Sequence, residues 1–179
     1  MTVVQELDNS FLFIDRAYVV NDEMETASEW AAKHITTNKA IKWIVGKYAE
    51  ADHANSNGQF FELAGLRVAQ PSIQYSPMNI DHHQNEIVGT WTASEMLYPK
   101  SGNTIANPYI EVLGAFWRAK FPETMQRVES AFNTGMLALS MEAIGESVTC
   151  VGAAGCGETF AFKGPFDPSY CDHINERAS

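Results

Sequence analysis

The stretch NIDHHQNEIVG, residues 79–89, sets two adjacent histidines directly behind an aspartate and ahead of an apolar run. His82 and His83 are neighbours, so on an extended segment their side chains face opposite ways and a given site uses one of them. A neutral imidazole whose second nitrogen is held by a carboxylate is the usual general base for a serine nucleophile. The stretch is therefore a candidate for the general base of a hydrolase whose nucleophile lies elsewhere.

Two other interpretations of the histidine pair stay open. The triplet DHH also matches the two-metal phosphoesterases named for it, which need further aspartates and histidines upstream. The first 70 residues hold no D-x-D pair and only two histidines, His34 and His53, so this interpretation is disfavoured. The other alternative is a pair of polar residues in a surface turn that carries no chemistry.

Ser140, in the stretch MLALSMEAI (136–144), is the candidate nucleophile. If this stretch is a strand, alternation places successive side chains on opposite faces. One face would carry Leu137, Leu139, Met141 and Ala143, and the other Ser140 and Glu142. An apolar face turned to the core would leave the serine and the glutamate together on the other side. The alternative is a buried or edge hydroxyl without a chemical role.

All three cysteines of the chain fall in its last 30 residues, in the patterns C-x5-C-G and C-x-H. Three thiolates and one imidazole form a closed tetrahedral ligand set, the kind that holds structural zinc. The four candidate ligands are Cys150, Cys156, Cys171 and His173. The surrounding segment has little hydrophobic periodicity, so a metal would supply folding energy that a core cannot. The alternative is three buried or idle cysteines.

Length and composition narrow the function classes. The chain has 179 residues, 45% of them hydrophobic, which favours one compact domain. Its formal net charge is −10, so its field repels phosphate backbones and anionic lipid, and we expect neither nucleic acid nor a membrane as partner. No apolar run approaches the roughly 18 to 20 residues that span a bilayer, and the N-terminus lacks the features of a signal peptide. A soluble, cytosolic protein is expected.

Alternating strands and helices must position these residues. Apolar periodicity, turn residues and helix caps predict the elements. Strands are expected at 11–20, 86–97, 108–118 and 136–144, and helices at 24–34, 38–52, 59–69 and 121–135. The last helix is the clearest, because Pro122 suits its first position and Gly135 suits a left-handed cap.

Three segments together resemble the phage prohead core proteases, which mature phage heads and are related in fold to the herpesvirus assemblin proteases. They are PMNIDHHQNEIVGT (77–90), YIEVLGAFWRAKFPE (109–123) and NTGMLALSMEAI (133–144). Residues 79–82, Asn-Ile-Asp-His, match the family's histidine motif, Ile87 to Gly89 its following strand, and Ser140 to Glu142 its serine motif. The resemblance runs from about residue 11 to 175.

The resemblance implies a serine endopeptidase in which Ser140 is the nucleophile and His82, rather than His83, is the general base. The third catalytic residue stays open. Family members use a histidine or an acidic residue downstream of the serine. By order alone that role is open to Glu158, Asp167, Asp172 and His173. Some members also carry C-x2-C-G followed by C-x-H, although the first spacing here is five.

The implied fold is α+β, a herpesvirus-protease-like β-barrel flanked by helices. A protease domain would span 1–148, with a Cys/His-rich, zinc-binding segment at 149–179 packed on it. Catalysis would need no cofactor. The expected substrates are scaffold and major capsid proteins and the chain itself, inside the prohead in the cytoplasm of an infected bacterial host, and a homo-oligomer is compatible with this setting. The alternative function is a non-enzymatic, zinc-stapled capsid assembly or scaffold module.

Overall fold

The computed structural model describes most of the chain. The described residues are 13–19, 29–36, 38–53, 61–80, 83, 85–101, 104–105, 107–141, 147–151, 155–163 and 167–178. For 13–19, 100–101, 104–105, 140–141 and 177–178 the description covers the backbone alone. Statements about what the fold lacks refer to these residues.

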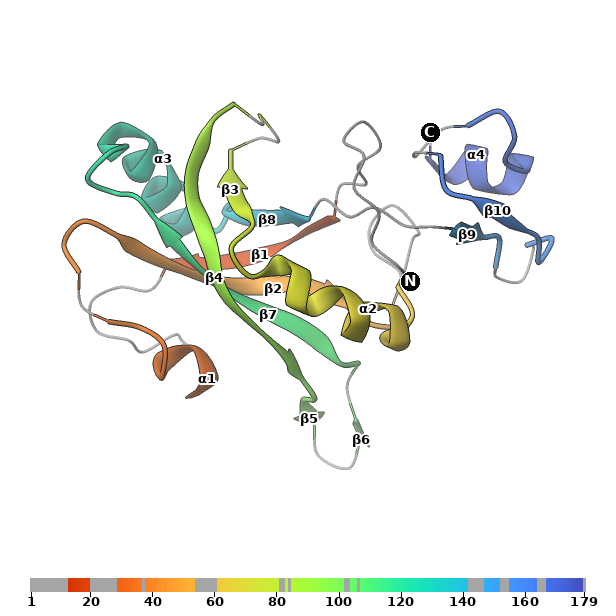
Figure 1. Ribbon diagram of the computed structural model, residues 1–179, viewed down its shortest axis with the longest axis horizontal. Coiled ribbons are helices and arrows are strands. Elements are labelled where there is room, and N and C mark those ends of the chain that lie inside the picture. Colours follow the sequence, from red (N-terminus) through yellow and green to blue (C-terminus); the bar gives the residue numbers. More distant parts are fainter. Residues whose placement is uncertain are drawn as a thin grey trace.

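Six antiparallel strands form the main sheet (Figure 1). Their order across the sheet is β3-β4-β7-β2-β1-β8. The four inner strands are long, namely β4 (Ile87–Leu97), β7 (Tyr109–Phe116), β2 (Lys42–Glu50) and β1 (Phe13–Val19). The two edge strands are short, namely β3 (Pro77–Asn79) and β8 (Ala138–Met141). With the helices, this architecture confirms the α+β class.

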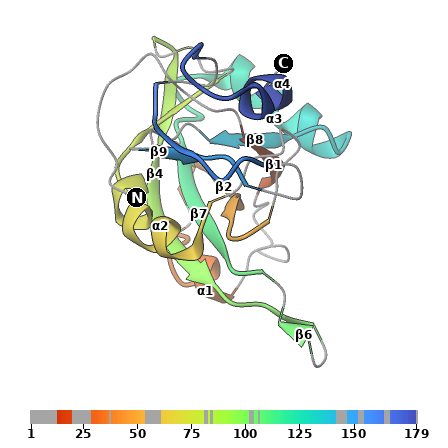
Figure 2. The same ribbon diagram turned by 90° about the vertical axis from the view of Figure 1, so that its right-hand side faces the viewer.

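Four helices, a 3-10 turn and four shorter strands complete the described part of the chain. The helices are α1 (Glu29–Ala32), α2 (Leu63–Ala69), α3 (Pro122–Asn133) and α4 (Asp172–Ala178), and a 3-10 turn, η1 (Gln70–Ile73), continues α2. Strands β5 (Lys100–Ser101) and β6 (Thr104–Ile105) form a hairpin that projects from the ends of β4 and β7 (Figure 2). Strands β9 (Ser147–Thr149) and β10 (Thr159–Ala161) pair with each other near α4. None of the described helices is both long and apolar enough to cross a membrane.

The sheet is buried on both faces along β7. One face carries the main core, a cluster that includes Met78, Ile110, Val112, Phe116, Met125 and Val128. The other face carries the minor core, formed by Ala31 of α1 with Val45 and Leu113. A strand covered on both sides needs apolar residues at consecutive positions rather than at alternate ones, and β7 meets this requirement from Ile110 to Phe116 apart from Glu111 and Gly114.

The predicted helix over 38–52 is wrong, because residues 42–50 form strand β2. Its apolar positions have spacings of three and four, which fit a helical stripe. In the structure Ile44 packs in the main core and Val45 in the minor core, on opposite faces. Hydrogen-bonded neighbours on both sides, β1 and β7, decide the conformation, and a local pattern cannot reveal them.

Most of the other predicted elements are found where the sequence placed them. Helix α3 starts at Pro122, and Gly135 just beyond its end has φ +71°, the left-handed conformation that glycine adopts without strain. Met125 and Val128 on its inner face are buried. The strands predicted at 11–20, 86–97, 108–118 and 136–144 correspond to β1, β4, β7 and β8. The helix predicted at 59–69 is α2, and the described part of the helix predicted at 24–34 is only the single turn α1.

The predicted closed barrel is not found among the described residues. Closure would require the edge strands β3 and β8 to hydrogen-bond to each other, but each pairs only with its inner neighbour. Both edge strands are short and offer few backbone groups for such a ladder. They nevertheless contribute to one cluster. Met78 at one edge is part of the main core, and the partly buried side chains of Ile80 at the same edge and of Leu137 and Leu139 at the other pack against it.

We predict that Gly89→Ala lowers the free energy of unfolding by about 2–3 kcal/mol. Gly89 lies opposite Met78 in β3 and Phe116 in β7. An added Cβ would lie 3.0 Å from Phe116 Cα and in hard contact with the carbonyl oxygen of Ala115, and backbone cannot yield as a side-chain end can. Urea denaturation measures the change. Gln126→Ala, at an exposed position of α3, is the control and should shift stability by less than ~0.5 kcal/mol; equal effects would contradict the explanation.

Candidate functional site

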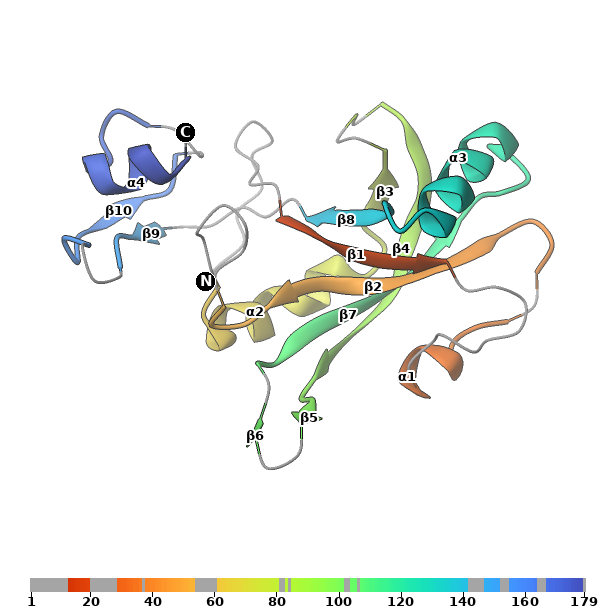
Figure 3. The same cartoon turned by 180° about the vertical axis from the view of Figure 1, so that it is seen from behind.

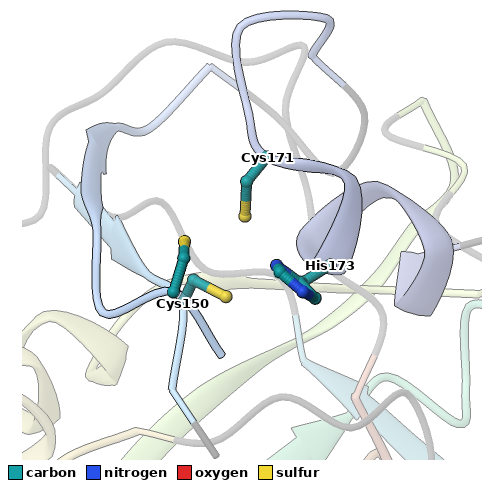
Figure 4. A group of neighbouring side chains, drawn as sticks. Cys150, Cys171 and His173 are labelled. Atoms are coloured by element: carbon teal, nitrogen blue, oxygen red, sulfur yellow. The ribbon is translucent and has the colours of Figure 1, made fainter. Parts of the chain in front are cut away.

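The four predicted metal ligands lie together. One donor atom from each of Cys150, Cys156, Cys171 and His173 falls within 4.8 Å of all the others. Figure 4 shows the thiols of Cys150 and Cys171 and the imidazole of His173 converging on one region. All three cysteines are free. Residues separated by more than twenty positions in sequence are thus gathered into one Cys3His group.

The hairpin of β9 and β10 positions the first two cysteines. Beyond the three ladder pairs of this hairpin, Cys150 N–H donates to the Glu158 carbonyl at 2.9 Å, and Gly157 N–H donates to the Cys150 carbonyl at 3.0 Å. Cys156 therefore returns beside Cys150 at the end of the loop. Gly157 has φ +75°, which is strained for any residue with a Cβ. This conformation explains the glycine that directly follows the second cysteine in C-x5-C-G.

The start of α4 positions the other two ligands. Cys171 directly precedes the helix, and its carbonyl accepts hydrogen bonds from the backbone N–H groups of Ile174 at 3.0 Å and Asn175 at 3.2 Å. His173, the second residue of α4, is held by the same turn. The helix start thus presents the thiol and the imidazole of C-x-H toward the hairpin.

A small set of contacts supports this arrangement. Tyr170 is 5% exposed, its ring lies 5.7 Å from that of Phe160, and its hydroxyl accepts a 2.6 Å hydrogen bond from Lys163 N–H. Burial raises the pKa of the Tyr170 hydroxyl. Asp167 accepts hydrogen bonds from the side chain and the backbone N–H of Ser169, and these bonds lower the pKa of Asp167. These supporting contacts were not predicted from the sequence, although Asp-Pro-Ser at 167–169 is a recognisable turn signal.

The donor set and its spacing fit a tetrahedral metal ion. Zinc binds thiolate at about 2.3 Å and imidazole at about 2.0–2.1 Å, so the donors of a zinc tetrahedron lie roughly 3.5–3.8 Å apart. The separations of up to 4.8 Å here need only a small contraction. The sulfur-rich set favours zinc over hard cations such as magnesium or calcium. The Cys3His group could therefore hold a metal such as zinc.

The predicted catalytic pair is described only in part. The backbone of Ser140 lies in β8, opposite Ile14 of β1, but its side chain is not among those described. His82 and Asp81 lie outside the described residues. Their neighbour His83 is exposed; its N–H donates to the Ile80 carbonyl at 2.9 Å, and its carbonyl accepts from Glu86 N–H at 2.9 Å. The pairing of Ser140 with His82 stays a prediction.

The four candidates for the third catalytic residue all lie in the segment that follows β8. Asp167 is held by Ser169 and has Lys163 Nζ 3.9 Å away. His173 belongs to the Cys3His group. Glu158 and Asp172 are exposed on the same small unit. Two of the four therefore have contacts within this segment, Asp167 with Ser169 and Lys163 and His173 with the three cysteines.

We predict that the chain binds one zinc ion. We also predict that His173→Ala lowers the affinity for zinc by more than about 100-fold, because removing a residue that only hydrogen-bonds to a ligand lowers metal affinity by roughly 10–100-fold. The reason is the loss of one of four ligands. His53→Ala, which removes an exposed imidazole outside the group, is the matched control and should leave affinity unchanged. Metal content by elemental mass spectrometry and titration against a zinc-binding dye measure both. Equal affinity for the two variants would exclude His173 as a ligand.

Comparisons with known proteins gave no match, whether with family models, with curated proteins or with solved structures. The functional assignment therefore rests on the motifs and the geometry of the chain itself.

Proposed function

We propose that this chain is a serine endopeptidase of the prohead maturation type, with Ser140 as nucleophile and His82 as general base. One observation carries the proposal beyond the motifs, namely that both edge strands contribute to the main core. Two partly buried residues pack against this core: Ile80, two positions before His82, and Leu139, directly before Ser140. Two residues of chain reach at most about 7 Å. The two motifs are thus attached at the two edges of one sheet, each next to a residue that packs against the same apolar cluster, and this common anchoring supports the proposal.

The proposed chemistry follows from these two side chains. Ser140 Oγ attacks the carbonyl carbon of the scissile peptide bond while His82 takes its proton. His82 then returns the proton to the leaving amine, and water completes the hydrolysis in the same way. Backbone N–H groups near Ser140 would stabilise the oxyanion. The proposed substrates are scaffold and major capsid proteins and the chain itself, within the prohead of an infected bacterium.

In this proposal the metal is structural zinc. Four protein ligands leave no open coordination position, so a bound ion would hold the hairpin and α4 together without activating a water molecule. The described part of 147–178 buries only Cys150 and Tyr170 among its apolar residues. So small a core needs another source of folding energy, and metal ligation supplies it.

A second candidate function is a non-enzymatic, zinc-stapled capsid assembly or scaffold module. The observation that favours it is the open sheet. Among the described residues β3 and β8 each lack a second neighbour, and such edges can pair with another chain. In this case Ser140 and His82 would not meet.

We predict that Ser140→Ala and His82→Ala each reduce cleavage by about 10⁴-fold or more, because the nucleophile and its base act as a unit. The purified chain is incubated alone and with its scaffold and capsid proteins, and the products are identified by intact mass spectrometry. Two matched controls should cut like the wild type: Ser130→Ala, at an exposed serine of α3, and His83→Ala, at the neighbouring imidazole.

Each outcome separates the two candidate functions. Fragments that disappear in both active-site variants and persist in both controls support the protease. A folded wild-type chain that cuts neither itself nor its partners contradicts the protease and favours the assembly module. Cleavage that survives Ser140→Ala would exclude this serine as the nucleophile.

A further inference from the structure

The Cys3His group has the composition and spacing of a thiol switch as well as those of a metal site. Its three thiols are the only cysteines of the chain. Their sulfur atoms lie within 4.8 Å of one another. A disulfide has an S–S length near 2.05 Å and joins Cβ atoms roughly 3.5–4.5 Å apart. Thiols this close can pair with little backbone movement once no ion separates them.

The thiols differ in their access to solvent. Cys156 is exposed, Cys171 is half-buried, and Cys150 is only 3% exposed. Oxidation of cysteine follows thiolate character and exposure. A cysteine that binds a metal is already a thiolate. The exposure of each cysteine therefore decides the order in which the three are oxidised. Cys156 is therefore the thiol that a soluble oxidant reaches first.

Loss of the metal would destabilise the segment that holds it rather than the main sheet. The described part of 147–178 buries only Cys150 and Tyr170, whereas the main sheet has its own core of large apolar side chains. Strands β9 and β10 pair with each other and with no strand of the main sheet. Figure 3 shows β9, β10 and α4 together at one end of the molecule, apart from the sheet. Parts of a protein with so few buried apolar contacts open at a lower free energy than the core.

We propose that β9, β10 and α4 with the Cys3His group form a redox-sensitive unit, in which oxidation of Cys156 by a peroxide releases the metal and unfolds the unit reversibly. The Cys156 thiolate attacks hydrogen peroxide, the O–O bond breaks, and the departing hydroxide takes a proton to become water. Cys171 or Cys150 then attacks the resulting sulfenic acid, forms the S–S bond and expels a second hydroxide, which is also protonated. Two electrons pass from two thiolates to one peroxide, and the ion loses two of its four ligands.

This inference rests on the metal part of the proposed function and is independent of Ser140 and His82. The test uses the full wild-type chain loaded with zinc. Hydrogen peroxide is added, zinc release is followed with a chromogenic chelator, and samples are examined by intact mass spectrometry and by hydrogen exchange. A disulfide lowers the mass by about 2 Da, which separates it from the gain of about 16 Da when one of the seven methionines is oxidised.

We expect release of the zinc with the appearance of one disulfide, and faster exchange in β9, β10 and α4 while β2 and β7 stay protected. A thiol reductant with added zinc should restore the original exchange pattern. Cys156→Ser should slow the peroxide-driven loss of structure at least tenfold. If Cys156→Ser binds no zinc, the proposal is tested on the wild-type chain alone, by whether zinc release and disulfide formation proceed together with faster exchange in β9, β10 and α4.

Three results would overturn the proposal. If zinc stays bound in the presence of peroxide and the thiols are not oxidised, the zinc site is supported but the redox proposal is wrong. Exchange that rises in β2 and β7 together with α4 would show global unfolding. If the reduced chain binds no zinc, both the redox proposal and the proposed zinc site are wrong.

Discussion

The main fold depends on the pairing of β7 with β4 on one side and β2 on the other. These long ladders form the centre of the sheet, and side chains of β7 enter both cores. Val112, Leu113 and Phe116 have no exposed surface. Gly89 and Gly114 allow the close approach, because a Cβ at either position would collide with a neighbouring strand or side chain. The edge strands and α3 are then placed by the same main core.

The C-terminal unit is built by a different physical principle. Its buried apolar surface is small, and its order comes from turns, short ladders and the donor set of the Cys3His group. The left-handed Gly157, the bonds of Cys150 to Gly157 and Glu158, and the first turn of α4 together bring the donors within ligation distance. Hydrophobic burial stabilises the sheet, whereas ligation would stabilise this unit. The two parts should therefore respond separately to denaturant and to chelators or oxidants.

Local patterns were sufficient wherever the determining interactions are local. The ends of α3 follow from Pro122 and Gly135, and the ligand set follows from residue chemistry and clustering. The segment 38–52 shows the limit. Its apolar residues satisfy a helical spacing, yet Ile44 and Val45 pack on opposite faces of a central strand. Burial on both faces removes the alternation by which a strand is usually recognised.

The sequence by itself therefore determined the best-defined helix, the strands β1, β4, β7 and β8 and the identity of the four Cys/His donors, because short-range sterics and side-chain chemistry control these features. Only the tertiary structure decided that residues 42–50 form a strand, that the sheet is open among the described residues, and that Ile80 and Leu139 share one core. It also decided that the four donors lie within 4.8 Å. These features depend on pairing between distant segments, whose free energy belongs to the contact and cannot be assigned to either segment alone.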